Sequence, residues 1–275
     1  FNDGNGSNSG HVRVYKWDGS SWNQLGSDLD GEAANDYYGW SISLSADGET
    51  IGIGTPYNDG NGGGSGHVRI FNWDGSSWSQ VGSDIDGENS SDRSGNSISI
   101  SEDGNTIAIG AEDNDGGGDN SGHVRVYSWD GSSWNQVGSD IDGANANEKL
   151  SNVSLSSDGT RVAIGSANTD EGRLDVKGFV RVYNLNNNSW TQLGSDIQGE
   201  QNGDEFGYSL SIADDGNTLA IGSPYGDDNG TSSGYVKVYS WNGSAWSQVG
   251  DNIAGEAAGD YSGWSTSLSA DGTII

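Results

Sequence analysis

The stretch SGHVRIFNWDGSSWSQVGSDIDGE, residues 65–88, occurs in five similar copies along the chain. Its valine lies at residues 12, 68, 124, 180 and 236, which are steps of 56, and its second tryptophan keeps the same step. A period of this size is typical of a repeat architecture in which one supersecondary unit buries its apolar faces only against its neighbours. The repeat therefore decides the fold class.

Within one repeat, four short segments alternate apolar and polar residues as β-strands do. They are WSISLS (40–45), TIGIGT (50–55), HVRIFNW (67–73) and SWSQVG (77–82), which we call strands A to D. Asp-Gly pairs mark tight turns between A and B and between C and D. Long loops (56–66 and 83–95) follow strands B and D.

Four antiparallel strands per repeat predict an all-β fold, a five-bladed β-propeller of 56-residue repeats in one domain, 1–275. Because the chain begins and ends inside a repeat, the closing blade is expected to be shared by both termini. The predicted blades are 263–275 joined to 10–26, 39–82, 95–138, 150–194 and 207–250.

The strand order places the two kinds of connection on opposite faces. Tight turns gather on one face, and all the long, Gly- and Asn-rich acidic loops gather on the other. Binding sites usually lie on loops held by a rigid scaffold, so the long-loop face is the expected functional face.

The charge is strongly acidic, with 11 Lys and Arg against 40 Asp and Glu and a formal net charge of −29. This charge disfavours nucleic acid as a partner. No apolar run is long enough to insert into a membrane, and the chain has no cysteine.

Carboxylates in the long loops can hold a hard cation such as Ca²⁺ with oxygen ligands. Two interpretations stay open: a cation site, or solvated turn residues, with no cofactor certain. The candidate metal ligands are Asp28, Asp30, Glu32, Asp36, Asp84, Asp86, Glu88, Asp92, Asp113, Asp115 and Asp119.

One position in strand C carries a cation in every repeat, and in so acidic a chain it is expected to pair with a carboxylate. These residues are Arg13, Arg69, Arg125, Arg181 and Lys237. Candidate N-glycosylation sequons favour an extracellular or surface location. Their asparagines are Asn5, Asn89, Asn187, Asn229 and Asn242.

One copy of the repeat carries Phe206-Gly207-Tyr208-Ser209, Gly222-Ser223-Pro224 and then GYVKVY (234–239). These motifs resemble the FG-GAP repeats of integrin α-subunit β-propellers and related extracellular proteins. The resemblance implies propeller blades in an extracellular protein. Such repeats often carry an Asp-rich calcium loop between strands A and B, whereas the link here is as short as SADGET (45–50).

No set of reactive residues stands out from the repeats. The expected function is therefore a non-enzymatic recognition or adhesion module that presents the acidic loop face to a protein or glycan. One alternative is a structural subunit of a surface filament or virion, which self-assembles by strand exchange at the blade shared by the termini or through the face with the tight turns. Another is a propeller hydrolase or lyase.

Overall fold

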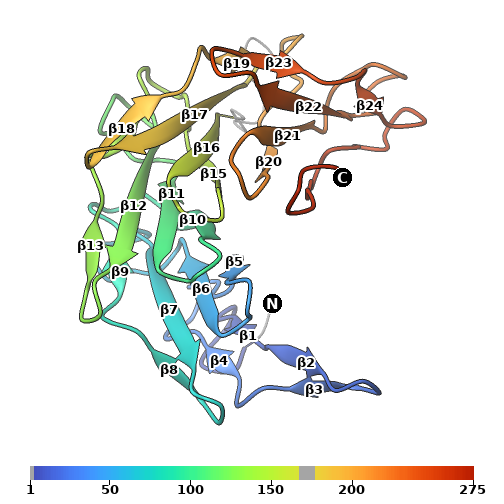
Figure 1. Ribbon diagram of the computed structural model, residues 1–275. Helices are drawn as coiled ribbons and strands as arrows, with labels where there is room; N and C mark the ends of the chain where they lie inside the picture. The colour runs from blue at the N-terminus through green and yellow to red at the C-terminus, as the bar shows by residue number, and fades with distance from the viewer. Residues whose placement is uncertain (1–2, 167–176) are drawn as a thin grey trace.

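The computed structural model describes residues 3–166 and 177–275, and every regular element in them is a β-strand. The strands form an open arc of successive sheets (Figure 1). Among these residues there is no helix with the length and hydropathy needed to span a bilayer.

Four repeats form complete sheets with the strand order A, B, C, D. The first is β5 (Ser41–Leu44), β6 (Thr50–Thr55), β7 (His67–Trp73), β8 (Trp78–Gln80). The second is β10 (Ser94–Ile100), β11 (Thr106–Ala111), β12 (His123–Trp129), β13 (Trp134–Gln136). The third is β15 (Asn152–Leu155), β16 (Arg161–Ser166), β17 (Phe179–Asn186), β18 (Ser189–Gln192). The fourth is β20 (Ser209–Ile212), β21 (Thr218–Ser223), β22 (Tyr235–Trp241), β23 (Trp246–Gln248). The repeated four-stranded antiparallel sheet predicted from the sequence is thus present.

Each sheet also has a short fifth strand that the sequence pattern did not predict. It follows strand D and pairs with the first two residues of strand C, as His67↔Asp86 and Val68↔Ile85. These strands are β9 (Ile85–Asp86), β14 (Ile141–Asp142), β19 (Ile197–Gln198) and β24 (Ile253–Ala254). The beginning of each acidic D–A loop is therefore fixed to its own sheet.

The first repeat has strands C and D and the short fifth strand, β4 (Leu29–Asp30), and its strand C is divided in two. β1 (His11–Val12) pairs with β4, and β2 (Tyr15–Trp17) pairs with β3 (Trp22–Gln24). The predicted joining of this half-blade to residues 263–275 is absent: no hydrogen-bonded strand pairing connects them, and residues 265–275 contain no strand. The ends of the arc lie apart on its open side (Figure 1).

The hydrophobic core lies between neighbouring sheets rather than within one of them. Between the first two complete sheets, for example, Val68 and Ile70 pack against Ile98, Ile107 and Ile109. The sheets approach closely because glycines in strand B leave room for the next backbone. A Cβ at Gly110 would lie 1.9 Å from the carbonyl oxygen of Ser151.

The same polar contacts connect each sheet to the next. A strand D tryptophan donates its indole N–H to a backbone carbonyl of the preceding repeat at 2.8 to 2.9 Å, in the pairs Trp78–Leu25, Trp134–Val81, Trp190–Val137 and Trp246–Leu193. The fifth pair of this series, Trp22 and Val249, is divided between the two ends, where these residues are 66% and 53% exposed.

The inner strands and the A–B turns are connected in series too. The backbone N–H of Ile100 donates to Ser43 Oγ at 3.0 Å, and Leu155, Ile212 and Leu268 repeat this contact in the later sheets. In the turns, a backbone hydrogen bond leads from each repeat to the next, through Ala46, Glu102, Ser157, Asp214 and Ala270. Every connection thus joins immediate neighbours in the arc.

Candidate functional site

Strand A lies on the concave side of each sheet, and the A strands of neighbouring sheets contact one another (Figure 1). The residues just before strand A and just after strand B therefore gather at the inner edge of the long-loop face. We call this edge the inner rim and define it by twelve residues of the D–A loops, the B–C loops and the start of strand A. They are Tyr37, Trp40, Tyr57, Arg93, Glu112, Asp113, Lys149, Glu205, Tyr208, Tyr225, Tyr261 and Trp264.

The backbone presents the five D–A residues of the inner rim in the same way. Each has a left-handed conformation, with φ of 55° at Tyr37, 57° at Arg93, 50° at Lys149, 54° at Glu205 and 53° at Tyr261. Backbone hydrogen bonds to the adjacent B–C loop fix this conformation, as Arg93 N–H to Gly64 O at 3.1 Å. A left-handed residue other than glycine is strained and is common at functional sites.

The middle of the inner rim is charged. The Arg93 guanidinium lies 2.8 Å from a carboxylate oxygen of Glu112 and 3.0 Å from one of Asp113. Lys149 Nζ lies 3.2 Å from the other oxygen of Asp113, and both of these side chains are only 12% exposed. Burial alone would lower the pKa of Arg93, but the hydrogen bond to Glu112 and the charge of Asp113 outweigh it, so this pKa is raised.

Glu205 is the inner-rim carboxyl whose protonation is most altered. Burial raises its pKa to about 7. The nearby Tyr208 has its pKa raised first by burial and then by Glu205, Tyr225 and Glu112. Since Glu112 and Tyr208 belong to sheets that are not adjacent, these groups converge across the inner rim. A carboxyl that titrates near neutral pH can both accept and donate a proton in a reaction.

Aromatic rings lie on both sides of the charged residues. On the N-terminal side, the ring of Tyr57 lies 5.1 Å from Tyr37 and 5.8 Å from Trp40, and Arg93 lies over it at 5.3 Å. On the C-terminal side, Trp264 lies 4.8 Å from Tyr208 and 6.2 Å from Tyr261. The inner rim thus combines charged, titratable and aromatic groups.

Most of the predicted metal ligands have structural partners. Asp36 and Asp92 are buried and accept a hydrogen bond from Asn58 and Asn114 of the adjacent loop, at 3.1 and 3.0 Å. Asp115 accepts the backbone N–H of Asn120 at 2.7 Å. Asp30 and Asp86 lie in the short fifth strands, and the backbone carbonyl of Asp119 accepts the N–H of Asn147 at 2.8 Å. Asp113 belongs to the inner rim.

The recurring cation of strand C lies beside a carboxylate in every repeat. Arg13 pairs with Asp28 at 2.7 Å and Arg181 with Asp196 at 3.1 Å. Arg125 lies 3.4 Å from Glu88. Arg69 contacts Glu32 and Asp84, and Lys237 contacts Glu200. Arg181 also lies 3.4 Å from Glu148. Four of these cations, all but Arg13, therefore reach a carboxylate of the preceding repeat, so the pairs connect neighbouring sheets.

A histidine lies beside the carboxylates that contact Arg69 and Arg125, and each histidine forms a group of potential metal ligands with two carboxylates. The groups are Glu32, His67 and Asp84, and Glu88, His123 and Asp140. Both histidines are buried, and burial lowers the pKa of His123 to about 4, which keeps its imidazole neutral at pH 7. The arginine beside each group already neutralises part of its charge. All five predicted sequon asparagines, Asn5, Asn89, Asn187, Asn229 and Asn242, are exposed.

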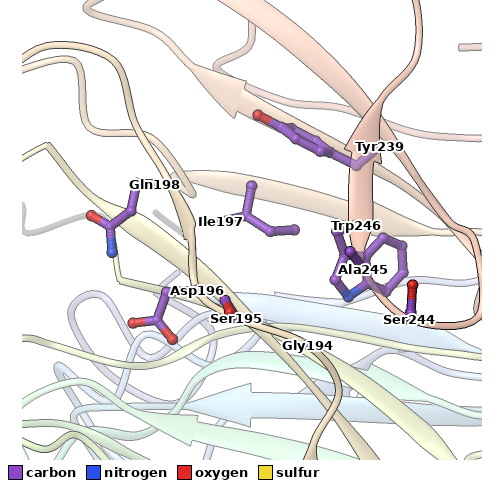
Figure 2. Close-up of a pocket in the computed structure, with 9 residues that line it drawn as sticks. All are labelled: Gly194, Ser195, Asp196, Ile197, Gln198, Tyr239, Ser244, Ala245 and Trp246. Carbon is purple, nitrogen blue, oxygen red and sulfur yellow. The ribbon is translucent and has the colours of Figure 1, made fainter.

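A groove of about 300 Å³ lies outside the inner rim, between strands of neighbouring repeats (Figure 2). Ile197, Tyr239 and Trp246 face this groove, whereas the carboxylate of Asp196 points away from them (Figure 2). A second groove of about 220 Å³ occupies the equivalent place one repeat earlier, beside Ile141, Tyr183 and Trp190. Because the groove repeats with the sheets, it is a consequence of their packing.

The sequence pattern did not single out Arg93, Glu112, Lys149 or Glu205. A signal was present, because this position before strand A reads Tyr, Arg, Lys, Glu and Tyr in successive repeats, while the residue that precedes it is an Asp or Glu in every repeat. A side chain that changes in chemistry from copy to copy takes no part in packing contacts that all copies share. Such a position is therefore a candidate for function.

The repeated sheets and the loop face define this chain as a protein of the β-propeller class. The FG-GAP repeat model matches residues 29–71 and 198–239. The chain therefore carries FG-GAP repeats, which confirms the resemblance read from its motifs. A search of curated proteins by sequence found no match.

Several solved structures are similar in fold. The periplasmic gluconolactonase PpgL of Pseudomonas aeruginosa has a TM-score of 0.57 at 16% identity, covering 89% of this chain and 64% of that one. A candidate 6-phosphogluconolactonase of Bacteroides uniformis has a TM-score of 0.55 at 15% identity, covering 90% and 69%. A candidate 6-phosphogluconolactonase of Bacteroides fragilis has a TM-score of 0.52 at 12% identity, covering 88% and 59%.

The comparison corrects the functional expectation drawn from the sequence. We expected a non-enzymatic adhesion module, but these structural neighbours are named as lactonases, so that expectation was wrong. It rested on the lack of a reactive set within single repeats, whereas the inner rim brings together charged and aromatic side chains from several repeats. The chain spans slightly less than two thirds of the length of the first neighbour, at 64%.

Proposed function

We propose that this propeller is a lactonase-type hydrolase whose reaction takes place at the inner rim. The observation that carries the proposal is Glu205, whose pKa burial raises to about 7, beside Tyr208, whose own pKa is raised by burial and then by Glu205, Tyr225 and Glu112. The names of the structural neighbours support the same reaction class.

In this proposal, the ionised Glu205 removes a proton from water as the water oxygen adds to the lactone carbonyl carbon. The ring C–O bond then breaks, and the proton passes to the departing ring oxygen, which gives the hydroxy acid. Arg93 and Lys149 hold Glu112 and Asp113 in place around the substrate. General acid and base catalysis of this kind contributes about 10²–10⁴-fold to rate.

The test is hydrolysis of gluconolactone by the purified chain, followed by base consumption at constant pH. We expect a rate that increases in proportion to protein concentration above the uncatalysed rate. A rate equal to that of buffer, with the protein folded by circular dichroism, would exclude the proposal.

We also propose that the arc closes as a five-bladed ring, with residues 273–275 adding as strand B to β2. Support comes from the repeat register, in which Ile274 and Ile275 correspond to Thr50 and Ile51 of β6. Ile274 is 70% exposed and Trp22 is 66% exposed, and both would be covered by closure. In this ring the whole chain, 1–275, is one propeller.

Calcium is proposed for the acidic loops, and an extracellular or surface location for the protein. The net charge of −29 and the carboxylate groups around His67 and His123 support calcium binding. The exposed sequon asparagines support the extracellular or surface location. Crowded carboxylates repel one another, and a divalent cation that binds only the folded chain relieves this repulsion.

The expected result for calcium is a melting temperature that rises more with millimolar Ca²⁺ than with NaCl of equal ionic strength. Differential scanning calorimetry measures both. Equal shifts would mean that the salts only screen the acidic surface, and the calcium proposal would be wrong.

A further inference from the structure

The cations of the inner rim are already neutralised. Arg93 is bound by Glu112 and Asp113, and Lys149 is bound by Asp113, so these four side chains sum to zero charge. A phosphate on a substrate would have to displace a carboxylate from one of them, within a chain of net charge −29. Binding of an anion here is therefore opposed both locally and by the field of the whole molecule.

The aromatic side chains of the rim, in contrast, leave open surface. Trp40 is 49% exposed, Tyr261 41% and Trp264 52%. Ring contacts among them are tilted or edge-on, as between Tyr261 and Trp264 at 87°, so the rings do not stack face to face and part of their surface stays exposed. An exposed aromatic face beside hydrogen-bonding groups suits a ligand with both C–H and hydroxyl surface.

Hydrogen-bonding groups lie next to these rings. Tyr208 lies beside Trp264 and within electrostatic reach of Glu205 and Glu112. Carboxylates accept hydrogen bonds from hydroxyl groups, and the phenol both donates and accepts. The inner rim thus offers apolar stacking and hydroxyl recognition without a free positive charge.

We propose that the inner rim selects an uncharged, polyhydroxylated ring, so that its substrate is an unphosphorylated sugar lactone. That this ring is a substrate rests on the proposed hydrolase function. The class of ligand rests only on the contacts of the inner rim. It separates this chain from an enzyme that acts on the 6-phosphate ester.

The experiment measures binding and hydrolysis separately. Binding of glucose and of glucose 6-phosphate is measured by ligand-observed NMR titration, and hydrolysis is measured with gluconolactone and its 6-phosphate. We expect glucose to bind at least about 10-fold more tightly than its phosphate ester, which corresponds to about 1.4 kcal/mol. Gluconolactone is expected to have the higher kcat/KM by a similar factor.

A matched pair of variants tests the stacking residue. Trp264→Ala is expected to weaken glucose binding about 10-fold, and Trp264→Phe is expected to restore most of it. Trp17→Ala, at an exposed tryptophan beside the C–D turn, is expected to leave glucose binding unchanged. Equal or tighter binding of the phosphate ester, or no effect of Trp264→Ala, would overturn the inference. Glucose binding without hydrolysis of either lactone would exclude the hydrolase and support the ligand class.

Discussion

Replacing Glu205 by glutamine is expected to lower kcat for gluconolactone at least about 100-fold, with a small change in KM. The amide keeps the size and hydrogen bonding of the side chain but cannot take a proton from water. The measurement is initial-rate kinetics at pH 8. Glu102→Gln is the matched control, because Glu102 is an exposed residue of an A–B turn on the opposite face.

The pH dependence gives the same residue a second, independent readout. Burial raises the pKa of Glu205 to about 7, so the carboxylate required for proton removal forms only as the pH rises through that value. The wild-type rate should therefore increase between pH 6 and pH 8, roughly following one ionisation near 7. A rate that is flat over this range, or unchanged in Glu205→Gln, would remove Glu205 from the mechanism.

The contribution of Glu205 to the free energy of unfolding should fall as the pH rises, whereas the reaction rate should increase. The folded chain holds the Glu205 proton more tightly than the unfolded chain, so this group stabilises the fold most below its unfolded pKa and loses that contribution as pH rises through about 7. Glu205→Gln should therefore melt at a higher temperature than the wild type at pH 8 but not at pH 5. This comparison also shows whether the variant is folded.

Joining the two ends of the arc by a disulfide is expected to produce the largest gain in stability. In the sheet of β5 to β8, Thr50 pairs with Asn72, and the corresponding residues at the ends are Ile274 and Lys16. Trp73 N–H donates to Glu49 O at 2.7 Å, which makes Thr50 and Asn72 a non-hydrogen-bonded pair. Such pairs have Cα atoms about 4.5 Å apart, within the range of a disulfide.

The variant Lys16→Cys/Ile274→Cys should form an intramolecular disulfide, because the chain has no other cysteine. Closing so long a loop is expected to stabilise the fold by on the order of 4 kcal/mol and to raise Tm by about 10 °C. Thiol counting and non-reducing gels measure the cross-link, and calorimetry measures Tm.

The register-equivalent pair Thr218→Cys/Ser240→Cys is the positive control, because these residues already face each other in one sheet. Cross-linked dimers in place of monomers would show that the ends meet in a second copy. Free thiols in Lys16→Cys/Ile274→Cys, with the control pair oxidised, would mean that the five-bladed ring does not close.

The fold was predictable where the sequence repeats. Alternating residues in TIGIGT and HVRIFNW, with Asp-Gly between segments, correctly predicted β6 and β7 and their equivalents. The two-residue strand Ile85–Asp86 was not predictable, because two residues are too few to show a period. Strand C of the first repeat is split because no strand B pairs with it. A local sequence pattern does not show whether such a neighbouring strand is present.

The site was harder to predict for a physical reason. Arg93, Lys149 and Glu205 come from three repeats, and only the arrangement of the sheets brings their loops to one rim. Asp113 was proposed as a metal ligand, but it contacts Arg93 and Lys149. A search for reactive motifs within one repeat misses a site to which each repeat contributes one residue.

The series of backbone hydrogen bonds through the A–B turns has a consequence for how the chain folds and opens. Ala46, Glu102, Ser157, Asp214 and Ala270 each connect only adjacent repeats, so the free energy of one sheet depends on its two neighbours and little else. In the open arc, the outermost sheets lack one neighbour and should exchange amide hydrogens fastest, and the central sheet of β10 to β13 slowest, whereas closure of the ring would remove this difference. Because Arg93 and Asp113 belong to that central part, the charged residues of the inner rim would remain ordered while both ends open and close.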